Sequence, residues 1–458
     1  MGLLIRGGEV VTSDARYRAE IYVEDQTITR IGADLSVPPG TEIIDATGKW
    51  IFPGFIDPHV HIYLPFMATF AKDTHETASV AALLGGTTTF IEMCCPSRTE
   101  DAFAGYNLWK EKADGRSACD YAFHMTVSRF DQNTETQLRE IVRDGTTSFK
   151  IFLSYKNFFG VDDSEMFQAL TLAKELGVIV AAHCENAELI SRLQQALLAE
   201  GKTGPEWHEP SRPESVEAEG TARFASFLEN TGASGYVVHL SCAPALKAAI
   251  EAKSRGVRLS IECVLPHLLL DKTAAERAGL EGMQHVMSPP LRDKRNQAAL
   301  WSAVAAGLID TVATDHCPFD NEQKLLGRDA FTLIPNGIPG IEDRVSLMYT
   351  HGVNRGRMDL HRFVDALSTR PAKLFGLFPR KGTIAAGSDA DLVLFDPTYR
   401  GTISARTHHI NNDYSGFEGF AVEGRPAVVT VRGKVQVRDG SFVGEKGRGQ
   451  LLRRAPMC

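Results

Sequence analysis

The chain has 458 residues, 43% of them hydrophobic and 23% charged, which is typical of a globular enzyme with one large domain and a smaller one. Its 49 basic and 57 acidic residues give a formal charge of −8, and this mild acidity argues against nucleic-acid or anionic-membrane partners. No apolar run reaches the ~18 residues that a membrane span needs, and the N-terminus lacks a signal-peptide pattern, so we expect a cytoplasmic protein.

The two ends of the chain show the same pattern. Residues 2–49 alternate between apolar and polar types with turn signals such as VPPG at 37–40, and residues 380–440 do the same. We therefore expect residues 1–52 and 376–440 to form one small β-sandwich domain built from both ends. Residues 441–458 show no clear period and are predicted to be a C-terminal arm.

The middle of the chain, residues 53–375, alternates between short β-rich runs and helical stretches. Eight strand–helix units in series predict a (β/α)₈ TIM barrel. Several helical stretches end at a glycine, where a left-handed C-cap is common; these are Gly85, Gly145, Gly177, Gly232, Gly256 and Gly307. The predicted strands are 55–61, 87–93, 121–127, 148–153, 178–183, 236–240, 258–264 and 310–314.

The first predicted barrel strand ends in GFIDPHVHIYLPF at 54–66. Because side chains alternate along a strand, His59 and His61 share one face and can bind one metal ion. An isolated His-x-His pattern is accidental about as often as it marks a metal site. The residues on the other predicted strands therefore have to distinguish the two. Their carboxyl ends carry further metal-ligand types, and a TIM barrel places all of these ends at its catalytic mouth. These further residues are Lys150, His183, His239 and Asp315.

Lys150 lies inside the apolar run SFKIF, where a free ammonium is strongly disfavoured. A neutral amine can react with carbon dioxide to form a carbamate that bridges two cations, whereas a lysine paired with a carboxylate is the alternative. The set suits two divalent ions: His59, His61 and Asp315 for one, and His183 and His239 for the other, with Lys150 shared. A hydroxide between such ions forms near neutral pH.

Six motifs in order resemble the cyclic amidohydrolases, in the branch of D-hydantoinases and dihydropyrimidinases. They are GFIDPHVH, SFKIFLSY, AAHCEN, VVHLS, SPPLR and TDHCPF. The resemblance implies N6-carboxylysine at Lys150, a binuclear centre that is usually zinc, with manganese or cobalt as alternatives, and a homotetramer. It also implies that Asp315 is the proton shuttle, that Tyr155 donates to the oxyanion, and that Ser288 and Asn336 hold the amide groups of the substrate ring.

Neighbouring residues distinguish among relatives. A dihydroorotase has an arginine two residues after the His-x-His, where this chain has Tyr63, and an allantoinase must hold a polar tail. The loops here are apolar, which favours 5-monosubstituted hydantoins, giving N-carbamoyl-D-amino acids, and dihydropyrimidines, giving N-carbamoyl-β-amino acids. The handedness follows from the resemblance only. A non-catalytic scaffold is disfavoured because all six candidate ligands are present. The apolar residues predicted to contact the substrate as a lid are Leu64, Phe66, Phe152 and Phe159. Core packing is the alternative for the aromatic residues, above all for Phe152, which has the same strand parity as Lys150.

Overall fold

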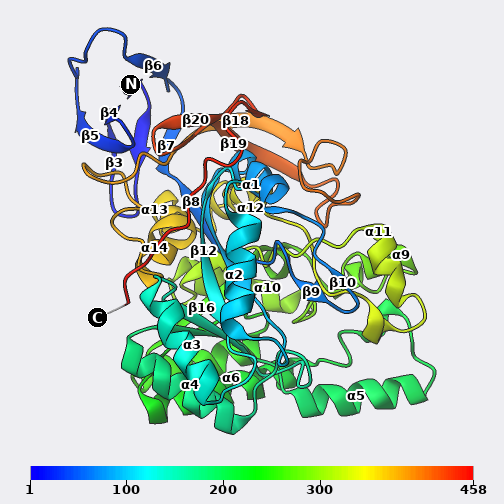
Figure 1. Ribbon diagram of the computed structural model, residues 1–458. Coiled ribbons are helices and arrows are strands. Elements are labelled where there is room, and N and C mark those ends of the chain that lie inside the picture. Colours follow the sequence, from blue (N-terminus) through cyan, green and yellow to red (C-terminus); the bar gives the residue numbers. More distant parts are fainter. Residues whose placement is uncertain (1, 457–458) are drawn as a thin grey trace.

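The computed structural model describes residues 2–456, and its centre is the predicted barrel (Figure 1). Eight parallel strands neighbour one another in chain order, and Val60 pairs with His316, which closes the sheet on itself. The (β/α)₈ prediction is confirmed. The strands are β8 (Phe55–Val60), β11 (Thr87–Cys94), β12 (Asp120–Thr126), β13 (Ser148–Phe152), β14 (Ile179–His183), β15 (Ser234–Val237), β16 (Leu259–Val264) and β17 (Thr311–Ala313).

Every residue of β8, β11, β12, β13 and β14 is buried, because both faces of a parallel barrel sheet are covered. Their continuous apolar runs therefore lack the alternation seen at the chain ends. Helices surround the barrel. They are α1 (His75–Leu84), α2 (Ala102–Ala113), α3 (Gln132–Arg143), α4 (Asp163–Leu176), α6 (Glu214–Thr231), α7 (Ala243–Ser254), α10 (Arg295–Ala305), α12 (Arg344–Met348), η5 (Tyr349–Val353), α13 (Leu360–Val364), η6 (Asp365–Thr369) and α14 (Arg370–Leu374).

The helix ends follow the local sequence. Helix α4 begins with a capping box between Asp162 and Glu165 and ends at Gly177, whose φ of 67° is left-handed. Gly145, Gly232, Gly256 and Gly307 also have positive φ. Gly85 is the exception to the prediction: its φ is −77°, and the left-handed residue is Gly86 with φ of 85°. Helix α1 still ends at Leu84 with Gly85 as its C-cap, and only the left-handed conformation lies one residue further on.

Short elements cover the carboxyl ends of the barrel strands. The two-residue strands β9 and β10 form a hairpin after β8, and α5 projects from the barrel at the lower right of Figure 1. These additions shape the mouth of the barrel. They are β9 (Pro65–Phe66), β10 (Thr69–Phe70), α5 (Ala187–Ala199), η1 (Pro205–Trp207), α8 (Leu265–Leu269), η2 (Lys272–Ala274), α9 (Leu280–Met283), α11 (Asn321–Lys324), η3 (Leu325–Gly327) and η4 (Phe331–Leu333).

Both chain ends join in the β-rich unit at the top of Figure 1, as predicted. Strand β7 pairs with β18 in a seven-stranded sheet, and a four-stranded sheet from the N-terminal region packs against it through a second apolar core. The domain limits 1–52, 376–440 and 53–375 stay a prediction. The strands are β1 (Leu3–Arg6), β2 (Glu9–Val11), β3 (Arg16–Arg18), β4 (Glu20–Glu24), β5 (Thr27–Gly32), β6 (Glu42–Asp45), β7 (Trp50–Pro53), β18 (Leu392–Thr402), β19 (Ala421–Val431), β20 (Lys434–Arg438) and β21 (Ser441–Phe442).

The C-terminal segment runs along the barrel of its own chain. Leu452 N–H donates to the Tyr121 carbonyl, and the buried Arg454 donates to Ser148 Oγ at 3.0 Å. Residues 457–458 of the predicted arm lie outside the described residues. Among residues 2–456, no helix is long and apolar enough to cross a membrane.

Candidate metal and substrate site

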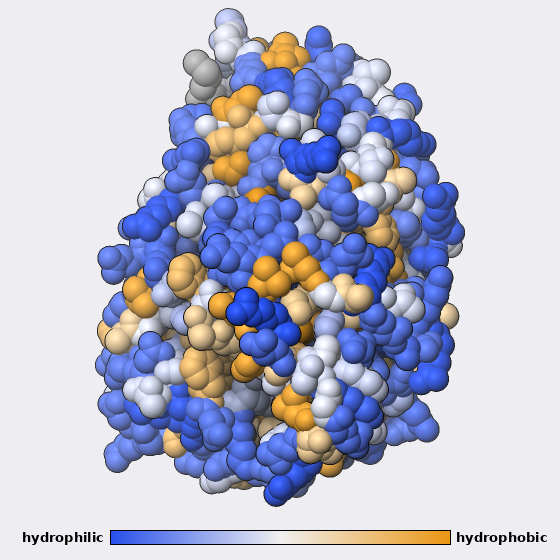
Figure 2. Space-filling view, turned by 90° about the vertical axis from the view of Figure 1, so that its right-hand side faces the viewer, coloured by the Kyte–Doolittle hydropathy of each residue, from blue (hydrophilic) through white to orange (hydrophobic). Residues whose placement is uncertain are grey.

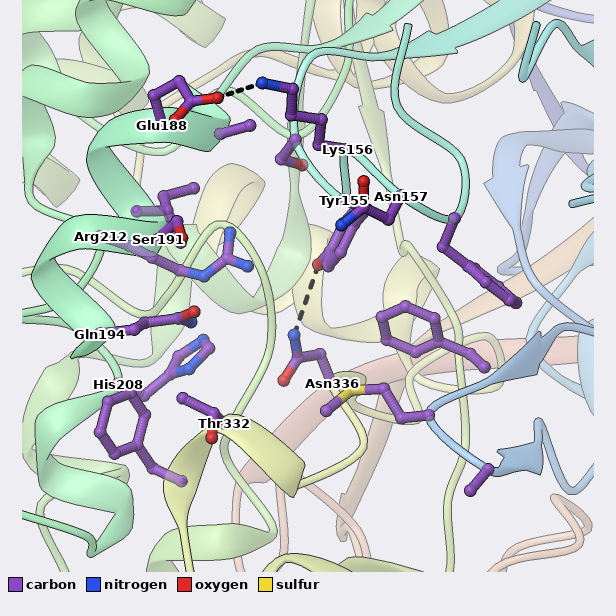
Figure 3. A pocket seen from close by; sticks show the side chains of 18 of the residues that line it. Tyr155, Lys156, Asn157, Glu188, Ser191, Gln194, His208, Arg212, Thr332 and Asn336 are labelled. Carbon is purple, nitrogen blue, oxygen red and sulfur yellow. Dashed lines mark hydrogen bonds and ion pairs between the residues drawn. The ribbon is translucent and has the colours of Figure 1, made fainter. Parts of the chain in front are cut away.

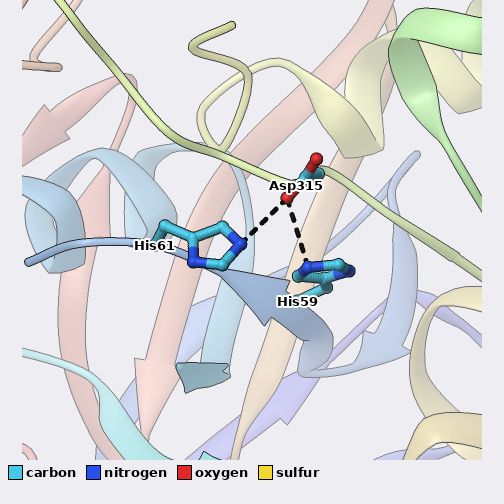
Figure 4. A group of neighbouring side chains, drawn as sticks. All are labelled: His59, His61 and Asp315. Carbon is cyan, nitrogen blue, oxygen red and sulfur yellow. Dashed lines mark ion pairs between the residues drawn. The ribbon is translucent and has the colours of Figure 1, made fainter. Parts of the chain in front are cut away.

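His59, His61 and Asp315 form a compact group at the carboxyl end of β8. The Nε2 atoms of both histidines lie 3.2 Å from Asp315 Oδ1, as Figure 4 shows. Asp315 N–H donates to the His59 carbonyl at 3.0 Å, so the segment after β17 is joined to the end of β8. The potential ligand atoms of the three residues lie within 4.8 Å of one another, a spacing that suits one metal ion.

The residue that orients His59 is Glu262 on β16, which sequence reasoning missed. Its Oε1 lies 2.7 Å from His59 Nδ1 and accepts the His239 backbone N–H at 3.0 Å, and its Oε2 accepts the Tyr236 hydroxyl at 2.6 Å. Burial raises the pKa of Glu262 to about 8. With Nδ1 engaged by this carboxyl group, His59 turns its Nε2 toward Asp315, which is the usual way of orienting a metal-binding imidazole.

His183 and His239 lie beside this group. Their ring centroids are 4.6 Å apart, and the His239 centroid is 5.4 Å from that of His59. His183 Nε2 contacts Glu185 at 2.7 Å, and Glu185 in turn accepts from Arg212 at 2.5 Å. Burial lowers the pKa of His59, His183 and His239, which keeps the imidazoles neutral and their lone pairs free to bind a metal.

Lys150 is fully buried on β13, and its Nζ has no hydrogen-bond partner. The sequence left open a pair between this lysine and a carboxylate, and none of the described carboxylates lies within 4.0 Å. Burial lowers the pKa of the ammonium to about 8, so a substantial fraction of the amine is neutral near physiological pH. A neutral, unpartnered amine is the form that reacts with carbon dioxide.

Three of the predicted site residues have a strained backbone. The φ angles of Tyr155, His239 and Asp315 are 56°, 40° and 52°, in the left-handed region that non-glycine residues rarely adopt. Each follows the end of a barrel strand. Such strain persists only where the surrounding structure enforces it, and it concentrates at functional sites.

The donor set has the chemistry of a metal site, with His59, His61 and Asp315 close enough together for one ion. His59 Nε2, His239 Nδ1 and Lys150 Nζ are buried without hydrogen-bond partners, which is costly in a dry interior unless another group uses these atoms. Asp315 adds a carboxylate: burial raises its pKa, but His59, His61 and Lys150 outweigh this and lower it to about 2. Imidazole and carboxylate donors suit zinc, manganese and cobalt.

The predicted substrate residues surround the same inner pocket. Asn336 Nδ2 donates to Ser288 Oγ at 3.0 Å and to the Tyr155 hydroxyl at 3.3 Å. Figure 3 marks the second of these contacts. The two amide-binding candidates therefore engage each other through their side chains. The pocket is lined by His61, Leu64, Phe66, Lys150, Phe152, Tyr155, Phe159, His183, His239, Ser288, Asp315, Cys317, Asn336 and Gly337. Of the predicted site residues, only His59 lies behind this lining.

The apolar lid residues pack on one another over the pocket. Phe159 stacks on Phe66 with ring centroids 6.1 Å apart and on Phe152 at 5.3 Å, and Phe66 meets the Tyr155 ring edge-on at 5.2 Å. Leu64 lines the pocket beneath them.

Outside the lid lies a cavity of about 970 Å³, bounded by β9, β10, α5 and η4. Phe66 and Phe158 belong to its lining, and so do His208 and Arg212, which Figure 3 shows facing Tyr155 and Asn336. On the corresponding side of the molecule, hydrophobic residues gather within a mainly hydrophilic surface (Figure 2). This cavity is the approach to the inner pocket.

The structure adds residues for which the sequence had only a faint signal. Glu262 is a lone acid within the apolar strand LSIECV, and Glu185 follows His183 by two residues. In the sequence, the clue to Glu262 was a single acidic residue inside a strand expected to be buried. Two further buried histidines, His124 and His316, each have both ring nitrogens engaged by neighbouring groups and are therefore not offered as metal ligands.

A parallel barrel with this donor set at its carboxyl edge defines a metal-dependent hydrolase. Residues 50–436 match the model of the Amidohydrolase family, and the chain belongs to that family. It is 45% identical to a D-hydantoinase of Geobacillus stearothermophilus, over 99% of this chain and 97% of that protein. It is 39% identical to a dihydropyrimidinase of Rattus norvegicus, over 100% and 89%.

A solved structure of a D-hydantoinase (dihydropyrimidinase) from Thermus sp. superposes with a TM-score of 0.99 at 76% identity, over 99% of both chains. The relationship predicted from the six sequence motifs is therefore confirmed. The chain is an enzyme of the hydrolase class.

Proposed function

We propose that the enzyme hydrolyses the amide bond of 5-monosubstituted hydantoins, giving N-carbamoyl-D-amino acids, and of dihydropyrimidines, giving N-carbamoyl-β-amino acids. One observation carries the proposal: five of the six candidate metal ligands, all except His59, line the same pocket as Tyr155, Ser288 and Asn336. The names of the relatives, D-hydantoinase and dihydropyrimidinase, support the same reaction.

In this proposal His59, His61 and Asp315 would hold one divalent ion, most simply zinc, and His183 and His239 would hold a second. Lys150 would contribute as N6-carboxylysine, formed when its neutral amine attacks carbon dioxide, makes an N–C bond and releases one proton. Bound metal would lower the pKa of water to about 7 and polarise the substrate carbonyl. The unpartnered Lys150 Nζ supports this assignment.

The protein's own groups then handle the proton and the charge. Asp315, ionised because its pKa is about 2, accepts the proton of the attacking water and passes it to the amide nitrogen as the C–N bond breaks. Burial raises the pKa of Tyr155, so its hydroxyl stays protonated and donates to the developing oxyanion. Ser288 and Asn336 hold the ring amides through their backbones.

The activities of related enzymes, in particular that of a dihydroorotase, fit the pocket less well. A dihydroorotase needs a cation for the substrate carboxylate, yet Tyr63 packs on Trp109 with ring centroids 5.3 Å apart, and its backbone N–H donates to Glu92. Among the described residues that line the inner pocket, Lys150 is the one lysine or arginine. The lid contacts instead favour an apolar substituent.

The homotetramer and the cytoplasmic location stay predictions from the sequence. Sedimentation velocity of the purified protein tests the first, since a single species near four times the 50.1 kDa chain mass is expected. Fractionation of the source cells tests the second.

The deciding experiment is chiral chromatography of the products formed from racemic 5-benzylhydantoin, run beside dihydrouracil, dihydroorotate and allantoin. We expect N-carbamoyl-D-phenylalanine as the dominant product and clear turnover of dihydrouracil. Turnover of dihydroorotate or allantoin alone would overturn the proposed substrate class and keep the hydrolytic site. The Asp315→Asn variant is the control for contaminating activity.

A further inference from the structure

Lys324, the last residue of α11, is completely buried outside the candidate metal site. Its Nζ donates to three backbone carbonyls: Val286 at 3.0 Å, Pro335 at 2.7 Å and Gly337 at 2.8 Å. Each N–H of the ammonium thus has one acceptor.

This lysine differs from the other buried lysines of the described chain. Lys381 contacts three carboxylates, and Lys150 lies in the candidate metal site, whereas Lys324 has no carboxylate within 4.0 Å. Burial lowers its pKa to about 7, and three carbonyl oxygens favour the protonated form, because a neutral amine would turn its lone pair toward one of them. A buried ammonium is costly, and an apolar side chain would fill the same space without that cost.

The three carbonyls belong to the two segments that carry the substrate-binding candidates. Val286 precedes Ser288 by two residues, and Pro335 and Gly337 flank Asn336 on both sides. Gly337 N–H also donates to the Val286 carbonyl at 2.9 Å. One ammonium therefore joins both segments through their backbone carbonyls, and Lys324 itself does not line the inner pocket.

The segment around Asn336 has little freedom to move. A Cβ on Gly337 would lie 2.3 Å from the Cys317 carbonyl oxygen, so the backbone passes too close for any other residue. The carbonyls of Pro335 and Gly337 both point to Lys324. Because these two carbonyls lie on either side of Asn336, their hydrogen bonds to one ammonium hold the backbone of that residue in place.

We propose that Lys324 is a positioning residue that orients the backbones of Ser288 and Asn336 toward the two amide groups of the substrate ring. The inference rests on the substrate roles proposed above for these two residues. Since the ring amides are held in the ground state and in the transition state alike, loosening the segments raises KM more than it lowers kcat.

The test compares Lys324→Met, which keeps the length of the side chain and removes the charge, with Lys324→Gln, which keeps donors but cannot serve three carbonyls. A third variant, Ile28→Ala, truncates a fully buried residue in the sheet far from the pocket and controls for lost stability. The measurements are KM and kcat for dihydrouracil and for 5-benzylhydantoin, metal content, and Tm.

We expect Lys324→Met to raise KM for dihydrouracil at least tenfold, with kcat changed less than threefold and with wild-type metal content. The rise for 5-benzylhydantoin should be smaller, because lid contacts with its phenyl group remain. The KM of Lys324→Gln should fall between those of wild type and Lys324→Met. If Lys324→Met does not fold, Lys324→Gln alone tests the inference. KM values within twofold of wild type would overturn the inference, as would an equal rise in Ile28→Ala. A wild-type enzyme that turns over neither ring would overturn the proposed function and this inference with it.

Discussion

Replacing Glu262 with glutamine tests the carboxyl group that orients His59. The carboxyl group contacts His59 Nδ1 at 2.7 Å, the His239 backbone at 3.0 Å and the Tyr236 hydroxyl at 2.6 Å. A glutamine keeps an oxygen for His59 and His239, and Tyr236 can turn its hydroxyl to Thr311 Oγ1, 2.6 Å away. The substitution therefore removes the charge with little change of shape.

The expected loss is about 10- to 100-fold in zinc affinity, the usual effect of removing a partner of a metal-binding imidazole. That range equals about 1.4 to 2.7 kcal/mol, which is also the usual contribution of one hydrogen bond to a charged group. The loss should depend on pH. Because burial raises the pKa of Glu262 to about 8, the metal-free wild type carries a proton there below this pH and resembles the variant.

The difference in zinc affinity between the wild type and Glu262→Gln should therefore grow as the pH rises through 8 and shrink as the pH falls. Competition with a chelator between pH 6 and 9, with metal content from mass spectrometry, measures it. Glu92→Gln is the matched control: Glu92 is equally buried and accepts from His75 at 2.6 Å, Trp109 at 3.2 Å and the Tyr63 backbone N–H at 2.9 Å, none of which is a candidate ligand. An affinity for zinc in Glu262→Gln equal to that of wild type at every pH would refute the reasoning, and so would an equal loss in Glu92→Gln.

Three further substitutions test the roles proposed for the site. Asp315→Asn should lower kcat by at least about 100-fold, since general acid–base catalysis contributes that much or more, and near-normal turnover would exclude the shuttle role. Lys150→Ala should lose much of its metal and regain part of its activity with short carboxylic acids; full metal content would count against the carboxylated lysine. Phe159→Ala should lose more activity on 5-benzylhydantoin than on dihydrouracil, and equal losses on both would contradict the lid.

The sequence by itself determined the barrel and most candidates for the site. Apolar runs alternating with helical stretches predicted eight parallel strands, and a parallel barrel brings all carboxyl ends of its strands to one edge. Residues as distant as His59, His183 and Asp315 could therefore be grouped without knowing any contact, because each stands at or just past the end of a strand. Periodicity is a local property, which a sequence displays directly.

The tertiary structure decided which groups support those residues. Glu262 is 203 residues from His59 in the sequence. Neither segment by itself predicts that the two side chains meet across the barrel interior. The role of Lys324 could not be predicted from the sequence for a second reason. Its partners are backbone carbonyls, which every residue has, so no residue type indicates them. Side-chain types at strand ends can be read from a sequence, whereas hydrogen bonds across the fold depend on distances that only packing creates.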